Sequence, residues 1–226
     1  MSPEKVAQVF DAWATTGRAE SMEIDHGSRM ASVMATLPTR PTDHVLDLGS
    51  GNGWMTRALA ARVPEGTALG VDLSPEMVER ATQQSSDLQN ISFQACDLSS
   101  LPLEDASIDH VVSMEVLYYV DDLEAALKEV ARVLRSSGTV TIGVDYYQEN
   151  RHSHEWPSLM DLPMHLLSED RWEASLRDAG LVQVHRFRAL APPVKGGPDE
   201  DTEDFLTQVG TLVVRGAKPQ VSGPGG

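Results

Sequence analysis

One stretch of the sequence combines residue types that could bind a cofactor. Positions 45–53 read Val-Leu-Asp-Leu-Gly-Ser-Gly-Asn-Gly, an apolar run that contains the acid Asp47 and ends in alternating glycines. Glycines let the backbone turn sharply and let a ligand approach the main chain closely. A loop of this kind, between a buried strand and a helix, is typical of a site that holds a nucleotide-like molecule.

The spacing of the glycines separates several kinds of cofactor loop. The dinucleotide fingerprint G-x-G-x-x-G/A fails, because its last position falls on Trp54 or Thr56 instead of a small residue. The Gly-Lys-Ser/Thr ending of a phosphate-binding loop is also missing. The pattern that does fit is D-x-G-x-G-x-G, which runs from Asp47 to Gly53.

This pattern resembles the glycine loop of the class I S-adenosylmethionine-dependent methyltransferases. It looks most like the broad small-molecule group that includes the quinone-biosynthesis methyltransferases, and the similarity covers about residues 40–190. Four further segments are similar to the family's second to fifth strands and the turns beside them: 70–74, 96–98, 109–122 and 132–139. Several motifs in the family's order are more specific than a single glycine loop.

The resemblance implies S-adenosylmethionine as the cofactor. Asp72 would accept hydrogen bonds from both ribose hydroxyls, since a carboxylate offers two acceptor oxygens. Asp97 would bind the adenine amino group between apolar faces from Met77 and Leu98, and Asp47 would orient the methionine end. The expected cofactor-binding residues are Asp47, Gly49, Ser50, Gly51, Asn52, Gly53, Asp72, Leu73, Met77, Cys96, Asp97, Leu98 and Met114.

Methyl transfer is a displacement on a methyl group attached to a positively charged sulfur, so positioning supplies much of the catalysis. A base is needed only where the acceptor must lose a proton. The candidate catalytic residues follow the fourth and fifth strands or lie near the N-terminus: Glu115, Tyr118, Tyr146, His152, His154 and His26, with Tyr119 and Asp145 beside them. Glu115 could instead support the cofactor, Tyr118 could be a packing residue, and His152 and His154 could be plain surface. The pair His152-x-His154 lacks a third ligand, so we expect no metal site.

Alternating strands and helices must position these residues. Apolar runs predict strands at 44–48, 68–72, 91–95, 110–114, 139–145, 181–187 and 206–214. Helical patterns occupy 54–62, 123–134 and 168–179, and Ser74 followed by Pro75 starts another helix. The expected fold is a doubly wound α/β fold of the Rossmann-like methyltransferase type. Its seven-stranded sheet is mostly parallel, with an antiparallel hairpin at one edge.

Three parts are expected along the chain. Residues 1–36 form an N-terminal helical lid, in which Val6, Val9, Phe10 and Trp13 recur at helical spacing and a second helical stretch covers 28–37. Residues 37–216 form the methyltransferase domain. Residues 217–226 form a flexible tail, and 192–204 an exposed loop. Aromatic residues, histidines and methionines mix at 146–167, as in apolar pockets with a few polar handles, which indicates a substrate-side loop there.

The composition is that of an acidic protein. Lys and Arg number 18 against 34 Asp and Glu, for a net charge of −16, and lysine occurs only at positions 5, 128, 195 and 218. Such a surface repels phosphate backbones, so we expect no nucleic-acid partner. Abundant acid with little lysine is also typical of a protein adapted to high salt. No apolar run approaches the ~18 residues of a membrane span, and no secretory signal is evident, so we expect a cytoplasmic location.

Three functions remain open. The leading hypothesis is methyl transfer to O, N or C of a small-molecule acceptor. Methylation of RNA or protein is a second, although positions 113–116 read Ser-Met-Glu-Val, where amino-group nucleic-acid methyltransferases carry Asp/Asn-Pro-Pro-Tyr. A non-catalytic regulatory protein that binds S-adenosylmethionine is the third. The oligomeric state is open, with a homodimer as one alternative.

Overall fold

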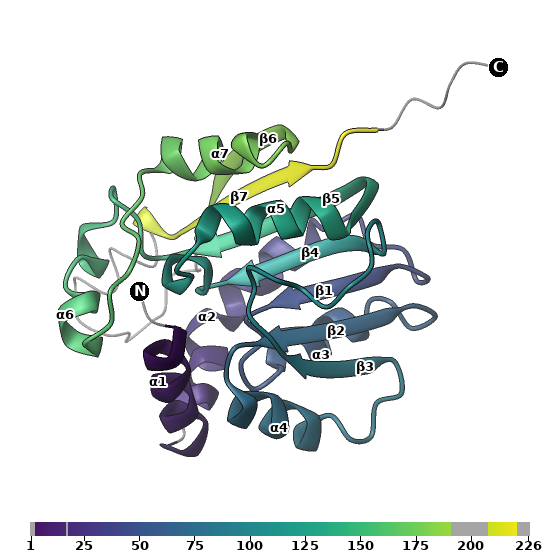
Figure 1. Ribbon diagram of the computed structural model, residues 1–226, viewed down its shortest axis with the longest axis horizontal. Coiled ribbons are helices and arrows are strands. Elements are labelled where there is room, and N and C mark those ends of the chain that lie inside the picture. The colour runs from purple at the N-terminus through teal and green to yellow at the C-terminus, as the bar shows by residue number, and fades with distance from the viewer. Residues whose placement is uncertain (1–2, 17, 191–207, 221–226) are drawn as a thin grey trace.

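The computed structural model describes residues 3–16, 18–190 and 208–220, and these residues form one mixed β-sheet with helices around it (Figure 1). Within these residues the sheet has seven strands in the order β3-β2-β1-β4-β5-β7-β6. The strands are β1 His44–Leu48, β2 Thr67–Asp72, β3 Ile91–Ala95, β4 Ile108–Met114, β5 Leu134–Val144, β6 Val182–Ala189 and β7 Thr211–Ala217. Strands β1 to β5 pair in parallel, whereas β7 pairs antiparallel with both β5 and β6. The predicted fold class is therefore confirmed, including the antiparallel pair at one edge.

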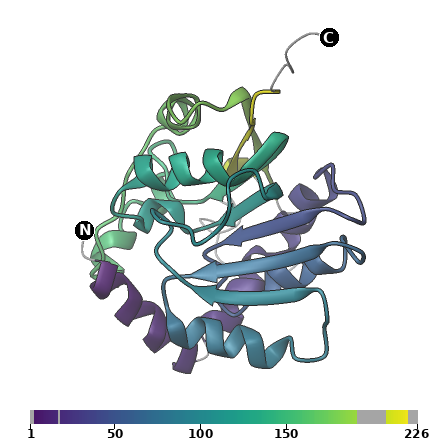
Figure 2. The same cartoon turned by 45° about the vertical axis from the view of Figure 1, so that its right-hand side comes forward.

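Helices cover both faces of this sheet. They are α1 Pro3–Thr16, α2 Arg18–Ala35, α3 Trp54–Ala60, α4 Pro75–Gln84, α5 Leu123–Val133, α6 Trp156–Met160 and α7 Glu169–Asp178, with short 3₁₀ turns η1 Leu117–Tyr119 and η2 Arg151–Ser153. Local sequence explains the clearest starts: Ser74 caps α4 by accepting a hydrogen bond from the Met77 amide, and Ser168 caps α7 in the same way. Figure 2 shows α1 beside α4 at one end of the sheet.

Side chains alternate between two apolar cores, one on each face of the sheet. On β4, Val111 packs with the α5 and α7 side, and the next residue, Val112, packs with the α2 and α3 side. The same alternation holds for Val213 and Val214 on β7. This is the period of two that a strand buried on both faces requires.

Some boundaries differ from the sequence prediction. Strand β5 begins at Leu134 instead of Thr139, because residues that read as a helix stop continue the strand, with Ser137 in a left-handed conformation at φ 64°. Helix α2 begins at Arg18, ten residues before the predicted stretch at 28–37, and α6 was not predicted. The exposed loop predicted at 192–204 lies outside the described residues, as do 221–226 of the tail.

Strand β7 runs to Ala217, and the Lys218 amide continues its pairing by donating to the Gly138 carbonyl at 2.9 Å. Ala217 and Lys218, the first two residues of the segment predicted as a flexible tail, are thus paired in the sheet. Among the described helices, none combines the length and the apolar character that crossing a membrane would require.

Candidate functional site

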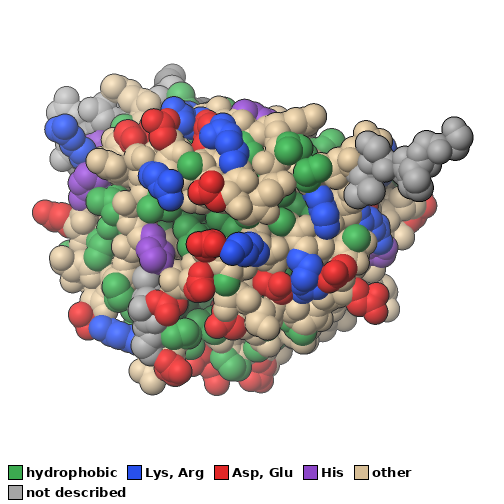
Figure 3. All heavy atoms as spheres, turned by 45° about the horizontal axis from the view of Figure 1, so that its top comes forward, with side chains coloured by type: hydrophobic (Ala, Val, Ile, Leu, Met, Phe, Trp, Pro, Cys, Tyr) green, Lys and Arg blue, Asp and Glu red, His purple; other side chains and the backbone are tan. Residues whose placement is uncertain are grey.

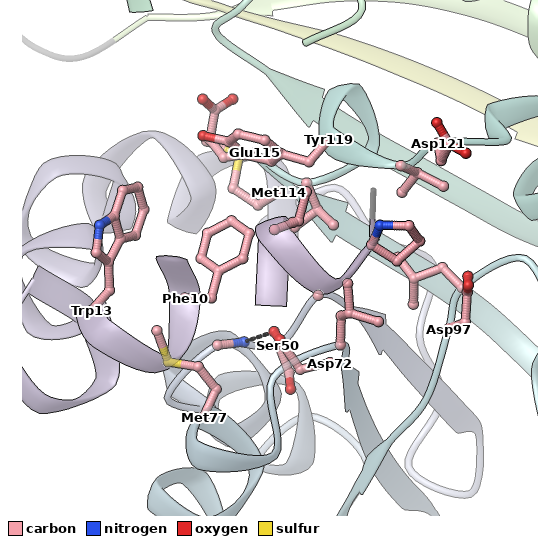
Figure 4. Close-up of a pocket in the computed structure, with 18 of the residues that line it drawn as sticks. Phe10, Trp13, Ser50, Asp72, Met77, Asp97, Met114, Glu115, Tyr119 and Asp121 are labelled. Atoms are coloured by element: carbon pink, nitrogen blue, oxygen red, sulfur yellow. Dashed lines mark hydrogen bonds between the residues drawn. The ribbon is translucent and has the colours of Figure 1, made fainter. Parts of the chain in front are cut away.

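A pocket lies at the carboxyl ends of β1, β2 and β4, where several segments of the chain converge (Figure 4). The glycine loop supplies residues 49–52, the ends of β2 and β3 supply 72–73 and 97–99, and the segment after β4 supplies 114–116 and 119–122. Helix α1 closes the remaining side. The cavity measures about 200 Å³. This is the crevice in which doubly wound folds bind their ligands.

The glycine loop owes its shape to backbone conformations that favour glycine. Gly49, Gly51 and Gly53 have φ angles of 73°, 51° and 80°. At Gly49 a Cβ atom would lie 2.3 Å from a methyl carbon of Val116, so the loop packs closely against the segment after β4. At Gly51 a Cβ would meet no heavy atom within 4 Å, and the space beyond it belongs to the pocket.

Asp72 holds this loop in place from the end of β2. Its Oδ2 accepts a hydrogen bond from the Gly51 amide at 2.8 Å, and its Oδ1 accepts one from the Ser74 amide at 2.9 Å. Each oxygen keeps a second lone pair for a ligand hydroxyl. Burial raises the pKa of the carboxyl, and backbone hydrogen bonds from Ser74, Gly51 and Leu73 offset part of that rise.

Two buried polar atoms near the loop have no hydrogen-bond partner among the described residues: Asp47 Oδ1 and Ser50 Oγ. The other Asp47 oxygen accepts a hydrogen bond from the Thr56 hydroxyl at 2.6 Å, and burial raises the pKa of Asp47 to about 7. Both residues line a cavity of about 30 Å³, together with His26. Because buried polar groups are nearly always paired in folded proteins, these two oxygens are suited to bind a polar ligand.

Acidic and apolar side chains line the opposite end of the pocket. Asp97 Oδ1 accepts two hydrogen bonds from Ser99, one from its amide and one from its hydroxyl, both at 2.8 Å. Leu98 and Met77 are buried and line the same pocket. Two of the predicted cofactor-binding residues, Cys96 and Gly53, are sequence neighbours of lining residues but do not line the pocket themselves. Burial raises the pKa of the Cys96 thiol to about 11.

Three aromatic side chains form the wall that faces the glycine loop. Phe10 packs edge-to-face against Trp13 and against Tyr119, with ring centroids 5.1 and 5.2 Å apart, and all three rings line the pocket (Figure 4). Helix α1 is tied to the start of α4 because the Ser74 hydroxyl donates to Asp11 at 2.5 Å. The N-terminal helix is thus part of the pocket wall.

Glu115 lines the pocket beside this wall and also contacts buried residues behind it. Its backbone has φ 60°, a strained conformation for a residue with a side chain, of the kind that gathers at functional sites. One of its oxygens accepts a hydrogen bond from the Tyr118 hydroxyl at 2.7 Å, and the other accepts one from the Asp145 amide. Burial and the nearby charge of Asp145 raise the pKa of Glu115 to about 8.

Behind Glu115 lies a buried charged cluster. Asp145 Oδ2 is 2.9 Å from Arg29 Nη2 and 3.4 Å from His26 Nε2. Burial alone would raise the pKa of Asp145, but His26 and Arg29 outweigh it and the pKa is lowered. Ligand-type atoms of His26, Glu115 and Asp145 lie within 4.8 Å of one another, a geometry that could suit a metal. Arg29 already supplies a cation to Asp145, so a metal is the weaker interpretation.

Arg29 was not among the residues predicted from the sequence. Its position three residues after His26 puts both on one helical face, which was the available signal.

The other predicted catalytic residues do not line the pocket. Tyr118 is buried and packs against Tyr146, with ring centroids 5.5 Å apart, and Tyr146 in turn stacks on Trp156. His152 and His154 are exposed in and after η2, and His154 Nε2 lies 3.0 Å from the Gln148 carbonyl oxygen. Of the predicted bases, the structure therefore brings Glu115 and Tyr119 to the main pocket and His26 to the smaller cavity.

Comparison with known proteins identifies the family. Residues 46–142 match the model of the methyltransferase domain. A putative methyltransferase solved in complex with the Haloferax volcanii Trm112 methyltransferase activator is 36% identical; the alignment covers 93% of this chain and 98% of that one, with a TM-score of 0.87. The chain belongs to the class I S-adenosylmethionine-dependent methyltransferases.

Curated relatives of this methyltransferase match over shorter stretches. The malonyl-[acyl-carrier protein] O-methyltransferase of Hahella chejuensis is 35% identical over 59% of this chain and 47% of its own length. The demethylmenaquinone methyltransferase of Roseiflexus castenholzii is 31% identical over 59% of this chain and 56% of its own. The methyltransferase thus spans about half the length of these two relatives. Family membership confirms the predicted cofactor, S-adenosylmethionine.

The residues present fit that cofactor. Its amino-acid end is polar and charged, and the unpartnered Asp47 and Ser50 oxygens lie at one end of the site. Its ribose needs paired acceptors, which Asp72 offers, and open space beside the backbone, which Gly51 leaves.

Proposed function

We propose that this methyltransferase moves the methyl group of S-adenosylmethionine to an O, N or C atom of a small-molecule acceptor. The observation that carries the proposal is the aromatic wall of Phe10, Trp13 and Tyr119, which encloses the pocket opposite the glycine loop. An enclosed, largely apolar space with a few polar groups suits a small ligand better than the flank of a macromolecule.

In this proposal the cofactor supplies a methyl group already activated by a positively charged sulfur. Asp72 binds the ribose hydroxyls, Asp97 binds the adenine amino group, and Asp47 faces the ammonium of the amino-acid end. The wall from α1 excludes water and fixes the acceptor close to the methyl group, which lowers the barrier by positioning. Where the acceptor must lose a proton, Glu115 takes it, because Glu115 lines the pocket and burial raises its pKa to about 8, near neutral pH.

Charge supports a small, non-phosphate acceptor. Five carboxylates line the main pocket, and its lining contains no Lys, Arg or His among the described residues. On the face in Figure 3, acidic and basic side chains are interspersed over the surface. An acidic pocket repels a nucleic-acid backbone, whose binding depends on basic groups that neutralise phosphates.

The experiment is to incubate the protein with methyl-labelled cofactor and a cell extract separated into metabolite, RNA and protein fractions. Label in the metabolite fraction supports the proposal. Label in RNA or protein alone contradicts it, and cofactor binding without transfer would indicate a regulatory protein. The Asp72→Ala variant serves as the control, since it should lose cofactor binding and hence all transfer.

A second candidate function is methylation of a macromolecule as part of a complex with a Trm112-type activator. It is favoured by the similarity to the putative methyltransferase solved with the Haloferax volcanii Trm112, which extends over nearly the whole length of both chains. Co-expression with that Trm112, followed by size-exclusion chromatography, tests it. A stable complex that labels RNA or protein would favour this candidate, and separate elution would exclude it.

A further inference from the structure

The small cavity behind the glycine loop contains a basic side chain that the proposed chemistry does not use. His26 comes from α2, is 8% exposed and lines this cavity with Asp47 and Ser50. The cavity shares Gly49, Ser50, Trp54 and Met114 with the main pocket, so it is the inner end of the same site. Its volume of about 30 Å³ matches one small polar group.

The small cavity must provide partners for two opposite charges of the cofactor. The amino-acid end of S-adenosylmethionine carries both an ammonium and a carboxylate. Asp47 supplies a countercharge for the ammonium, but a carboxylate taken out of water also needs a cation or several donors. Among the described residues that line the two cavities, His26 is the only Lys, Arg or His, and the unpartnered Ser50 hydroxyl is a second donor.

The surroundings of His26 favour its charged form. Asp145, at the end of β5, is 3.4 Å away, and Arg29, on the same helix as His26, helps to keep Asp145 ionised. Glu115 faces it from the end of β4, and Asp47 shares its cavity. Burial lowers the pKa of His26, but Asp145 and Glu115 outweigh burial and Arg29, and the pKa is raised above 6.5.

We propose that His26 is the cationic anchor for the carboxylate of S-adenosylmethionine, so that helix α2 completes the cofactor site. This assignment rests on the proposed function. It differs from a role for His26 as the catalytic base, because a carboxylate anchor acts on cofactor affinity and not on proton transfer. Asp145 is then a positioning residue that holds the His26 ring.

Two ligands that differ only at the amino-acid end test the assignment. S-adenosylhomocysteine has this end, whereas 5′-methylthioadenosine lacks it. Calorimetry on the full chain should show that His26→Ala weakens S-adenosylhomocysteine binding roughly 10–100-fold, the range expected for a hydrogen bond to a charged group, with less than about a twofold change for methylthioadenosine. Retained methylthioadenosine binding also shows that the variant is folded. The matched control is His185→Ala, an exposed histidine on β6 that should leave both affinities unchanged.

Two further measurements separate charge from shape. His26→Gln keeps a hydrogen-bond donor without the charge and should restore only part of the affinity. The wild type should bind S-adenosylhomocysteine more tightly than His26→Ala, and this difference in affinity should shrink as pH rises through the raised pKa of His26, because the imidazolium loses its charge there. The wild type and His26→Ala both keep Asp47, so the titration of Asp47 cancels in this comparison.

Each remaining outcome is decisive. Equal losses for both ligands, no loss for either, or a pH-independent advantage overturns the His26 assignment. Weaker S-adenosylhomocysteine binding by the wild type in EDTA also overturns it, in favour of a metal on His26, Glu115 and Asp145. If the wild type binds neither ligand, the proposed function fails together with it.

Discussion

Two glycines offer a matched pair of substitutions that tests the cofactor site. Gly51 and Gly180 both have positive φ angles, 51° and 88°, and at both a Cβ atom would meet nothing within 4 Å. An alanine in the left-handed region costs roughly 1–2 kcal/mol of stability at either position. For a protein of this size such a cost lowers Tm by roughly 2–8 °C. The two variants should therefore be destabilised alike, as differential scanning fluorimetry would show.

Binding should separate the two variants. Gly51 lines the pocket, whereas Gly180 ends the turn after α7 and lies outside the lining residues. One extra methyl in a closely packed site costs about 1–3 kcal/mol, which is about 5–150-fold in Kd. Calorimetry should show this loss of S-adenosylhomocysteine affinity for Gly51→Ala and none for Gly180→Ala. If Gly51→Ala binds as tightly as Gly180→Ala, the cofactor does not approach the backbone at Gly51, and the placement derived from the glycine loop is refuted.

Three further predictions concern pH and salt. Burial raises the pKa of Asp47 from 3.8 to about 7, so between those pH values the native state keeps a proton that the unfolded chain releases, and stability falls as pH rises. Asp47→Asn should therefore raise Tm at pH 8 while weakening S-adenosylhomocysteine binding. A lower Tm in the variant would contradict this. If Glu115 takes the acceptor's proton, kcat/KM should rise with pH through about 8, and Glu115→Gln should abolish that rise; an unchanged profile in the variant would exclude the role. With a net charge of −16, Tm should increase as KCl screens the repulsion between acidic side chains, and a flat salt titration would count against repulsion as a limit on stability.

The sequence predicted those parts of the fold that local patterns encode. The limits of β1 and β3 match the structure, since each is a short run with clear turns on both sides. The start of β5 was missed because Ser136, Ser137 and Gly138 resemble a helix stop, and pairing in the sheet overrides that local signal. Tertiary context decides such segments.

The same distinction applies to the site. The glycine loop is contiguous, so spacing alone could point to it. The cluster around Asp145 joins residues that are far apart: Arg29 bonds Asp145 across 116 positions and Thr211 across 182. No local pattern records such contacts. His152 and His154 were chosen for residue type, and their exposure in and after η2 depends on how the loop folds.

The position of β7 in the sheet affects how the chain folds during synthesis. Among the described strands it is the last in the sequence but an inner strand of the sheet, and β6 pairs only with it. Its Thr211 also accepts a hydrogen bond from Arg29, next to the buried cluster. During synthesis β6 therefore leaves the ribosome before the strand that pairs with it. A chain arrested before residue 211 would carry open edges on β5 and β6, a state that favours aggregation over function.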